Sequence, residues 1–205
     1  MIWKLAICAV MGYLLGSLNG ALVISRFFKH EDVRTKGSGN AGLTNYHRNF
    51  GGWSTLLVIA IDMGKMAAAA LLARLIYSDN ADLASMVTGF CVFIGHILPV
   101  FFNFKGGKGI LTAGALALVM DWRIFVILLV VFAVMFAATK YVSVGSIFCC
   151  FAYGICFALF FAMNPPVWII SMVIALIAIF THRGNIQRLL NGEERKTYLR
   201  KSKNK

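Results

Sequence analysis

The sequence contains few charged residues and very few acidic ones. Only 14% of its 205 residues are Asp, Glu, Lys or Arg, and eight of these are acidic, whereas 60% are hydrophobic. A soluble folded monomer carries more charge on its surface, so this composition is typical of a protein that crosses a membrane several times. We therefore interpret the net charge of +12 as a sign of sidedness in a membrane, and we expect no nucleic-acid partner.

Metal-binding and signal-peptide patterns are also missing. No C-x-x-C pair occurs and no His stands at metal-ligand spacing, so we expect no metal and no cofactor. The first 27 residues lack an A-x-A cleavage site and run directly into basic residues, which predicts a retained transmembrane helix. The cysteines lie inside apolar runs, where they act as small hydrophobic residues: Cys8, Cys91, Cys149, Cys150 and Cys156.

Long apolar stretches predict transmembrane helices, because a helix needs roughly 20 apolar residues to cross the hydrocarbon. One stretch, residues 110–139, contains Asp121 and Arg123 and forms either one long helix or two short ones. The stretches are residues 2–27, 53–77, 83–102, 110–139, 141–163 and 167–181.

The distribution of Lys and Arg decides between one helix and two. Basic residues concentrate in three segments, with five, two and eight Lys or Arg: residues 26–48, 105–108 and 183–205. Basic segments tend to stay in the cytoplasm. All three can do so only if the chain crosses twice between residues 110 and 139, with Asp121 and Trp122 at the outer tip.

We therefore predict an all-α polytopic membrane protein with seven transmembrane helices, one or two of them short. Its N-terminus lies outside and its C-terminus lies in the cytoplasm. Residues 1–190 are expected to form a single membrane domain. Residues 191–205 are expected to form a basic cytoplasmic tail that contacts anionic lipids.

The first basic segment contains GSGNAGLTNYHRN, residues 37–49. Its glycines permit close backbone approach, its Ser, Asn and Thr side chains offer hydrogen bonds, and Arg48 offers a fixed cationic fork, which together suit an oxyanion. The alternative is an ordinary solvated loop. Residues 37–42 also fit the dinucleotide pattern G-x-G-x-x-G, but a membrane helix precedes them, and that context does not suit a nucleotide fold.

The second segment contains GHILPVFFNFKGGKG, residues 95–109. Four glycines around Lys105 and Lys108 leave backbone N–H groups free to converge, and a helix follows, which resembles an anion site at a helix N-terminus. It is not a Walker A loop, because Phe102 and Gly109 stand where Gly and Ser or Thr are required. A flexible basic turn that touches lipid head groups is the alternative.

The third segment, HRGNIQRLLNGEE at residues 182–194, follows the last apolar stretch. His182 and Asn185 are three residues apart, so they share one face if the helix continues. Asp62 and Lys65, one turn apart inside an apolar stretch, are costly in hydrocarbon and are expected to form an ion pair or face a polar cavity. Ser143 lies on the same predicted side, either as a helix N-cap or as a ligand.

Together these three segments resemble the signature motifs of the bacterial acyl-phosphate:glycerol-3-phosphate acyltransferases, the PlsY family. The matching patterns are S-G-N-x-G-x-T-N followed by Arg48, a complete G-H-x-x-P-V-F-x-x-F-K-G-G-K-G, and H-x-x-N-I-x-R-L with G-x-E. Ala41 and Leu43 replace the usual Pro and Ala, which affects loop stiffness more than ligand contacts. The resemblance implies transfer of a fatty acyl group from acyl-phosphate to the 1-hydroxyl of sn-glycerol 3-phosphate, the first step of phospholipid synthesis.

Carried over residue by residue, the resemblance implies a site at the cytoplasmic face of a bacterial cell membrane. The implied catalytic residues are Ser38, Arg48, Lys108, His182 and Asn185. The implied substrate-binding residues are Asn40, Gly42, Thr44, Asn45, Lys105, Gly106, Gly107, Gly109 and Ser143. The implied supporting residues are His96, Arg188 and Glu194, with Glu194 acting through a cation such as Arg188.

Within that set, Ser38, Arg48 and Lys108 are expected to hold glycerol 3-phosphate. The resemblance assigns the donor phosphate to four further residues: Asn40, Thr44, Gly106 and Gly107. The expected partners are acyl-phosphate, glycerol 3-phosphate, membrane lipids and, transiently, the enzyme that produces acyl-phosphate.

Direct attack by the bound hydroxyl is expected, because phosphate is a good leaving group and no Ser-His-acid or Cys-His order occurs in the motifs. The base is either His182 or an oxygen of the donor phosphate. The soluble-type acyltransferase signature H-x-x-x-x-D follows none of the four histidines. An organophosphate transporter is an alternative, although transporters place substrate at the midplane between repeats. A lipid-binding scaffold that uses the basic tail is a third.

Overall fold

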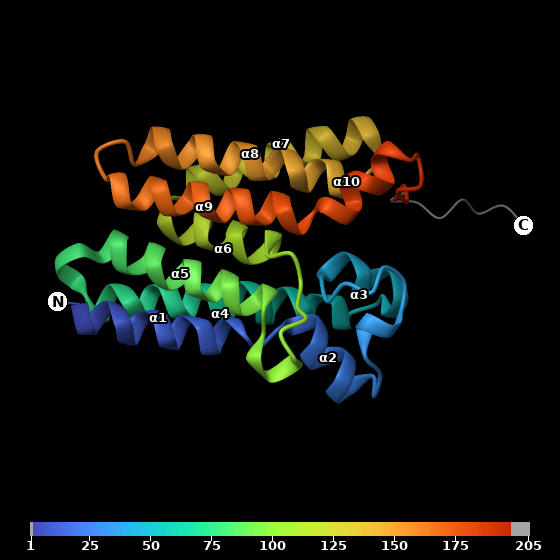
Figure 1. Ribbon diagram of the computed structural model, residues 1–205, viewed down its shortest axis with the longest axis horizontal. Helices are drawn as coiled ribbons and strands as arrows, with labels where there is room; N and C mark the ends of the chain where they lie inside the picture. The colour runs from blue at the N-terminus through green and yellow to red at the C-terminus, as the bar shows by residue number, and fades with distance from the viewer. Residues whose placement is uncertain (1, 198–205) are drawn as a thin grey trace, which may run out of the picture.

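The structure, a computed structural model, describes residues 2–197. That part of the chain is helical and contains no strand. Figure 1 shows long helices packed side by side, with the N-terminus of α1 at one end of the molecule. The α-helices are α1 (Ile2–Gly16), α2 (Gly20–Phe28), α3 (Leu43–Phe50), α4 (Ser54–Ile76), α5 (Ala81–Ile97), α6 (Ile110–Met120), α7 (Trp122–Thr139), α8 (Val142–Phe160), α9 (Pro165–Thr181) and α10 (Arg183–Leu190).

Several of these helices are long and apolar enough to cross a membrane. Four helical stretches qualify alone, and two bent pairs, α1 with α2 and α9 with α10, raise the number to as many as six. The shorter apolar helix α6 has 11 residues. This matches the predicted all-α membrane architecture, while the number of seven crossings and the placement of the termini stay predictions. The division at residue 190 also stays a prediction, and residues 198–205 of the predicted tail lie outside the described residues.

The predicted break near Asp121 is confirmed. α6 ends at Met120, and the Asp121 carboxylate accepts a hydrogen bond of 2.9 Å from the backbone N–H of Arg123, which caps the start of α7. An Asp at this position supplies a partner for a helix-terminal N–H group that has none within the helix. Residues 110–139 therefore form two helices, and α7 leaves most of its apolar side chains on the outside of the bundle.

The prediction of one continuous helix over residues 2–27 is wrong. α1 ends at Gly16, α2 begins at Gly20, and the two axes differ by 42°. The Asn19 side chain accepts a hydrogen bond from the N–H of Leu22, so it caps a second helix in the middle of the apolar stretch. The bend carries α2 across the end of α4 and positions the following loop, residues 29–42.

The bundle is packed closely around small residues. A Cβ atom at Gly16 of α1 would overlap the backbone of Val92, and one at Gly95 of α5 would overlap the carbonyl of Tyr13, so the two helices touch through their backbones. Such contacts are typical of helix pairs in membranes. A second apolar cluster forms around Tyr46 of α3 and Phe102, which are both buried, and it brings the first two sequence motifs together.

Figure 1 shows that α2, α3, the segment between α5 and α6, and α10 gather at the end of the bundle opposite the N-terminus of α1. These elements contain all three glycine-rich or polar motifs. The predicted convergence of the motifs on one face is therefore confirmed in the structure, and the cytoplasmic position of that face stays a prediction.

Candidate active site

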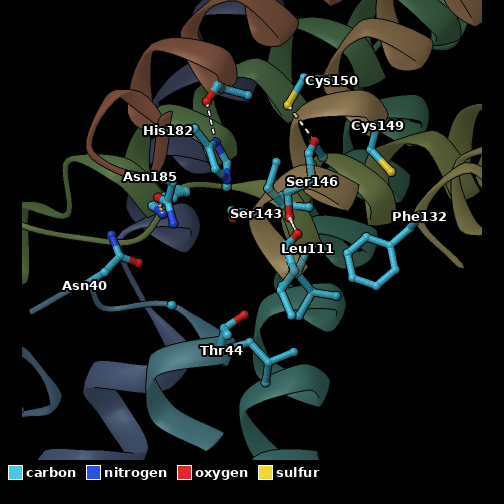
Figure 2. A pocket seen from close by; sticks show the side chains of 18 of the residues that line it. Asn40, Thr44, Leu111, Phe132, Ser143, Ser146, Cys149, Cys150, His182 and Asn185 are labelled. Atoms are coloured by element: carbon cyan, nitrogen blue, oxygen red, sulfur yellow. Dashed lines mark hydrogen bonds between the residues drawn. The ribbon is translucent and has the colours of Figure 1, made fainter. Parts of the chain in front are cut away.

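A cavity of about 650 Å³ opens between the motif-bearing end and the interior of the bundle. Its polar end is lined by residues from all three motifs, and it continues between α6, α7, α8 and α9 as a groove with apolar walls. Figure 2 shows Asn40 and Thr44 on one side of this cavity and His182 and Ser143 on the other. A single cavity thus joins hydrogen-bonding groups to a channel that suits an alkyl chain.

The loop of the first motif is organised by Asn45. Its amide nitrogen donates to the carbonyls of Val33, Lys36 and Asn40 at 3.0 Å, and its amide oxygen accepts from the N–H of Ser38 at 2.9 Å. These bonds use the hydrogen-bonding capacity of a buried side chain, so Asn45 shapes the loop. Four other predicted residues of this motif also line the cavity: Ser38, Asn40, Gly42 and Thr44.

Arg48 projects from α3 into the polar end of the cavity. Its guanidinium donates to the hydroxyl of Thr197 at 2.7 Å and to the carbonyl of Arg195 at 3.4 Å. The segment that follows α10 therefore contacts the cavity mouth through neutral partners. Burial lowers the pKa of Arg48, opposed by Glu194, yet an arginine stays protonated at any physiological pH.

The second motif differs from the expectation in one respect. The N–H groups of Gly106 and Gly107 are not free, because they donate to the carbonyls of Ile97 at 3.0 Å and His96 at 3.1 Å. The last carbonyls of a helix have no hydrogen-bond donors within it, and the N–H groups of this turn serve as donors to the last carbonyls of α5. Gly106, Gly107 and the exposed Lys105 do not line the cavity, so the expectation that the N–H groups of this turn are free is not met, while the contact of these residues with phosphate stays a prediction.

Steric contacts with α5 explain why glycine occupies positions 106 and 107. A Cβ atom at Gly106 would overlap the carbonyl of His96, and one at Gly107 would overlap the His96 ring. Gly109 differs again, because it caps α6 with φ of 80°, a conformation that favours glycine, and it lines the cavity. The turn therefore presents Lys108 and Gly109 to the cavity and uses Gly106 and Gly107 to hold itself against α5.

Lys108 is linked to the third motif by a chain of polar contacts. Its ammonium donates to the amide oxygen of Asn185, whose amide nitrogen donates to Glu194 at 2.7 Å. Glu194 also accepts from Arg188 at 2.7 Å, so the predicted pairing of these two side chains is confirmed. Burial raises the pKa of Glu194, but the hydrogen bonds from Asn185 and Arg188 outweigh it and hold the carboxyl ionised.

The charge of Lys108 responds to this environment. Burial lowers the pKa of Lys108 to about 8, and the nearby positive charges of Arg188 and Arg48 act in the same direction, opposed by Glu194. At neutral pH roughly nine-tenths of the molecules carry the ammonium. Lys108 is therefore a cation at the boundary between the phosphate-sized polar end and the groove.

His182 lies between α9 and α10, is 3% exposed and lines the cavity. Its Nδ1 lies 2.8 Å from the carbonyl oxygen of Ala178. Because a carbonyl can only accept, Nδ1 carries the hydrogen, and in the neutral ring Nε2 is then an acceptor. The helix does not continue straight past His182, because the axes of α9 and α10 differ by 49°, yet His182 and Asn185 both line the cavity.

Ser143 is not the N-cap of α8, because Tyr141 occupies that position and Ser143 lies in the first turn. Its buried hydroxyl makes no hydrogen bond of good geometry among the described residues, although it lies near the Glu194 carboxyl, whose pKa it helps to lower, and it lines the cavity. A buried hydroxyl without a partner is costly. Of the two alternatives for Ser143, the structure removes the cap, and the ligand role stays a prediction.

The walls of the groove were not predicted from the sequence. Cys149 and Cys150 belong to them, and their thiols donate to the carbonyls of Leu128 and Ser146 at 3.2 Å. Phe132, Tyr153 and Ala175 are also among the residues of the groove walls. No motif marks these residues, and the only available signal is the recurrence of small and polar residues along one face of α8, at positions 143, 146, 149, 150 and 153.

Comparisons with known proteins agree with this architecture. The family model described as glycerol-3-phosphate acyltransferase matches residues 6–192. A glycerol-3-phosphate acyltransferase of Prochlorococcus marinus (strain MIT 9312) is 38% identical over 189 residues, covering 91% of this chain and 94% of the relative. One of Finegoldia magna is 36% identical over 192 residues, covering 94% and 96%.

Two solved structures share the fold. The crystal structure of PlsY (YgiH), an integral membrane glycerol 3-phosphate acyltransferase, in its glycerol 3-phosphate form has a TM-score of 0.87 and 32% identity, covering 95% of this chain and 96% of that one. Its lysophosphatidic acid form has a TM-score of 0.83 and 31% identity. The match extends over nearly the whole chain, including all three motifs. The chain therefore belongs to the PlsY family of integral membrane glycerol-3-phosphate acyltransferases.

Proposed function

We propose that this enzyme transfers a fatty acyl group from acyl-phosphate to the 1-hydroxyl of sn-glycerol 3-phosphate, giving 1-acylglycerol 3-phosphate and inorganic phosphate. One observation carries this proposal: a single cavity has a cationic, hydrogen-bonding end that continues into an apolar groove. Such a cavity suits one substrate that is a phosphate monoester and another that joins a phosphate directly to an alkyl chain. The solved relatives with glycerol 3-phosphate and with lysophosphatidic acid support the acceptor and the product.

The phosphate of glycerol 3-phosphate is proposed to lie between Arg48, Ser38 and Lys108. Arg48 now holds the neutral hydroxyl of Thr197, and a phosphate dianion is the stronger partner because hydrogen bonds between charged groups are about twice as strong. Substrate binding would then displace Thr197 from Arg48. Asn185, with the ionised Glu194 behind it, holds Lys108 at the opposite side of this site.

The donor phosphate is proposed to contact Asn40, Thr44 and the hydroxyl of Ser143, with the acyl chain in the groove along Cys149 and Ala175. Lys108 lies where both phosphates meet. Its ammonium is therefore placed to offset the negative charge that grows on the departing phosphate, an electrostatic contribution that often exceeds others in catalysis. In this arrangement side chains, and not the backbone of Gly106 and Gly107, bind the donor phosphate.

The reaction is proposed to be a direct displacement. The 1-hydroxyl oxygen attacks the acyl carbonyl carbon, the bond from that carbon to the phosphate oxygen breaks, and phosphate leaves with the bonding pair. Nε2 of His182 accepts the hydroxyl proton, because Nδ1 is fixed as a donor to Ala178. A covalent enzyme intermediate is not needed, and the groove thiols are occupied as donors to backbone carbonyls.

The membrane arrangement is part of the proposal. The chain crosses a bacterial cell membrane seven times, with α6 as a short crossing, the motif-bearing end in the cytoplasm and the N-terminus of α1 outside. Residues 1–190 form the membrane domain, and the basic tail lies against anionic lipids. The enzyme that makes acyl-phosphate is proposed to deliver it transiently from the cytoplasmic side.

The proposal is tested by one assay on the purified protein in detergent, with acyl-phosphate and labelled glycerol 3-phosphate, followed by extraction of lysophosphatidate. We expect product with acyl-phosphate and none when acyl-CoA replaces it. Product from acyl-CoA alone would refute the donor, and uptake of glycerol 3-phosphate into liposomes without product would refute the enzyme.

A further inference from the structure

Three ionisable side chains are buried beneath the cavity and are not among the proposed substrate contacts. Asp62 and Lys65 come from α4 and His96 comes from α5, and each side chain is at most 4% exposed. The Lys65 ammonium lies 2.8 Å from the Asp62 carboxylate and 3.0 Å from Nδ1 of His96, so the predicted ion pair is confirmed and has a third member. Asp62 and His96 reach the cavity lining.

This cluster is bonded to the break between α1 and α2. Lys65 donates to the carbonyls of Gly16 at 3.0 Å and Leu18 at 2.9 Å, and Asp62 accepts from the N–H of Gly20 at 3.0 Å. An interrupted helix leaves such backbone groups without hydrogen-bond partners, and inside the bundle water cannot act as the partner. The ion pair therefore fixes the geometry of the break that directs α2 and the first motif.

The same cluster touches the loops of the first two motifs. The His96 ring lies directly against Gly107, and the His96 carbonyl accepts from the N–H of Gly107. Asn19, inside the helix break, donates to the carbonyl of Ala41 at 3.1 Å. A Cβ at Gly107 would lie only 2.9 Å from that same carbonyl, so the first two motif loops meet backbone to backbone above His96.

We propose that Asp62, Lys65 and His96 act as positioning residues for phosphate binding, by holding the loops of the first two motifs at a fixed separation through the α1–α2 break and Gly107. The proposal rests on the assignment of glycerol 3-phosphate to those loops. Asp62 and Lys65 carry opposite charges in contact, so the cluster stiffens the floor of the site without placing net charge beside two phosphates.

A purely structural ion pair and a positioning cluster predict different results. Removing one member leaves an unpaired buried charge and destabilises any protein, but replacing both members with neutral side chains of similar size is often neutral for stability. The informative variant is therefore the double substitution Asp62→Asn with Lys65→Met. The same helices supply a matched control in the Arg74 and Asp82 ion pair, 3.1 Å apart, which joins α4 and α5 near the opposite end of the bundle.

The experiment measures glycerol 3-phosphate binding by calorimetry in detergent, thermal stability, and kcat and KM for both substrates. For the double variant we expect a melting temperature close to that of the wild type and a dissociation constant for glycerol 3-phosphate at least about tenfold higher, with KM raised in parallel. The control pair Arg74→Met with Asp82→Asn leaves both binding and KM unchanged. His96→Leu, which leaves Asp62 and Lys65 paired and so creates no unpaired buried charge, weakens binding in the same direction and serves if the double variant fails to fold.

Binding within twofold of the wild type in a folded double variant would overturn the positioning role. So would equal losses of binding in the double variant and the control pair. A wild-type protein that binds glycerol 3-phosphate but makes no product from acyl-phosphate refutes the proposed donor and leaves the binding comparison valid. A wild type that does not bind glycerol 3-phosphate refutes the proposed function and the positioning role together.

Discussion

Lys108 makes the activity of this enzyme depend on pH in a direction that the structure fixes. Its pKa, lowered to about 8 mainly by burial, lies inside the range where a purified membrane enzyme can be assayed. In the proposed mechanism the protonated form holds phosphate and stabilises the leaving group, so activity is expected to fall as the pH rises through this pKa. Phosphate monoesters have a second pKa of about 6, so glycerol 3-phosphate is already a dianion above neutrality and does not cause this loss.

The size of the effect follows from the fraction of Lys108 that is protonated. With a pKa of about 8, that fraction falls from roughly nine-tenths at pH 7 to roughly one-tenth at pH 9, so kcat/KM is expected to fall about tenfold. Lys108→Arg keeps its positive charge over this whole range. Its activity is expected to be lower, because a planar guanidinium fits the contact with Asn185 poorly, but its alkaline limb is expected to be flat.

The assay is the rate of lysophosphatidate formation between pH 6.5 and 9.5, with the spontaneous hydrolysis of the donor subtracted. Lys105→Arg is the matched control, since Lys105 is exposed and lies outside the cavity lining, and its profile should follow that of the wild type. An alkaline limb of equal steepness in Lys108→Arg and in the wild type would show that another group titrates, and the role given to Lys108 would then be wrong.

Three further substitutions test other parts of the site. His182→Gln is expected to lower kcat by about a hundredfold or more with little change in KM, and near wild-type turnover would transfer the role of base to the donor phosphate. Arg48→Ala is expected to raise the KM for glycerol 3-phosphate by about tenfold or more, because a charged hydrogen bond is worth about 1.5–3 kcal/mol. An unchanged KM would show that Arg48 does not hold glycerol 3-phosphate. Ala175→Phe, about 10 Å along α9 from His182 at 1.5 Å per residue, is expected to fill the groove and shift a chain-length series toward shorter donors, and an unchanged series would place the chain elsewhere.

The sequence predicted those features whose cause lies within a few residues. The break at Asp121 is local, because one carboxylate caps the next helix two residues later. The pairing of Glu194 with Arg188 is equally local. The convergence of the motifs on one face was predicted from the positions of Lys and Arg. Each basic segment indicates its side of the membrane without any knowledge of how the helices pack.

Features set by distant residues were missed for a physical reason. The α1–α2 break depends on Lys65, which lies 47 residues after Leu18 and satisfies its carbonyl. The N–H groups of Gly106 and Gly107 were expected to be free, but α5 needs partners for its last carbonyls and the returning turn provides them. Neither requirement can be predicted from the sequence, because each depends on which helix ends are neighbours in the folded bundle.

The short helix α6 shows how the two halves of the site are joined. At 11 residues it spans only about 16 Å, so it is too short to cross an unthinned bilayer, whose hydrocarbon part is about 30 Å thick, and its proposed crossing requires a thinner bilayer at this place. Gly109 at its start packs against the ring of Phe93, which lies one turn before the end of α5, so α6 begins below the end of its neighbour. The first N–H groups of a helix have no partners within it, and the first residues of α6, Ile110 and Leu111, line the cavity beside Lys108. A helix long enough to cross the whole bilayer in place of α6 would carry Lys108 away from the groove. In the proposed mechanism, the departing phosphate would then lose the cation that the turn before α6 contributes to the cavity lining.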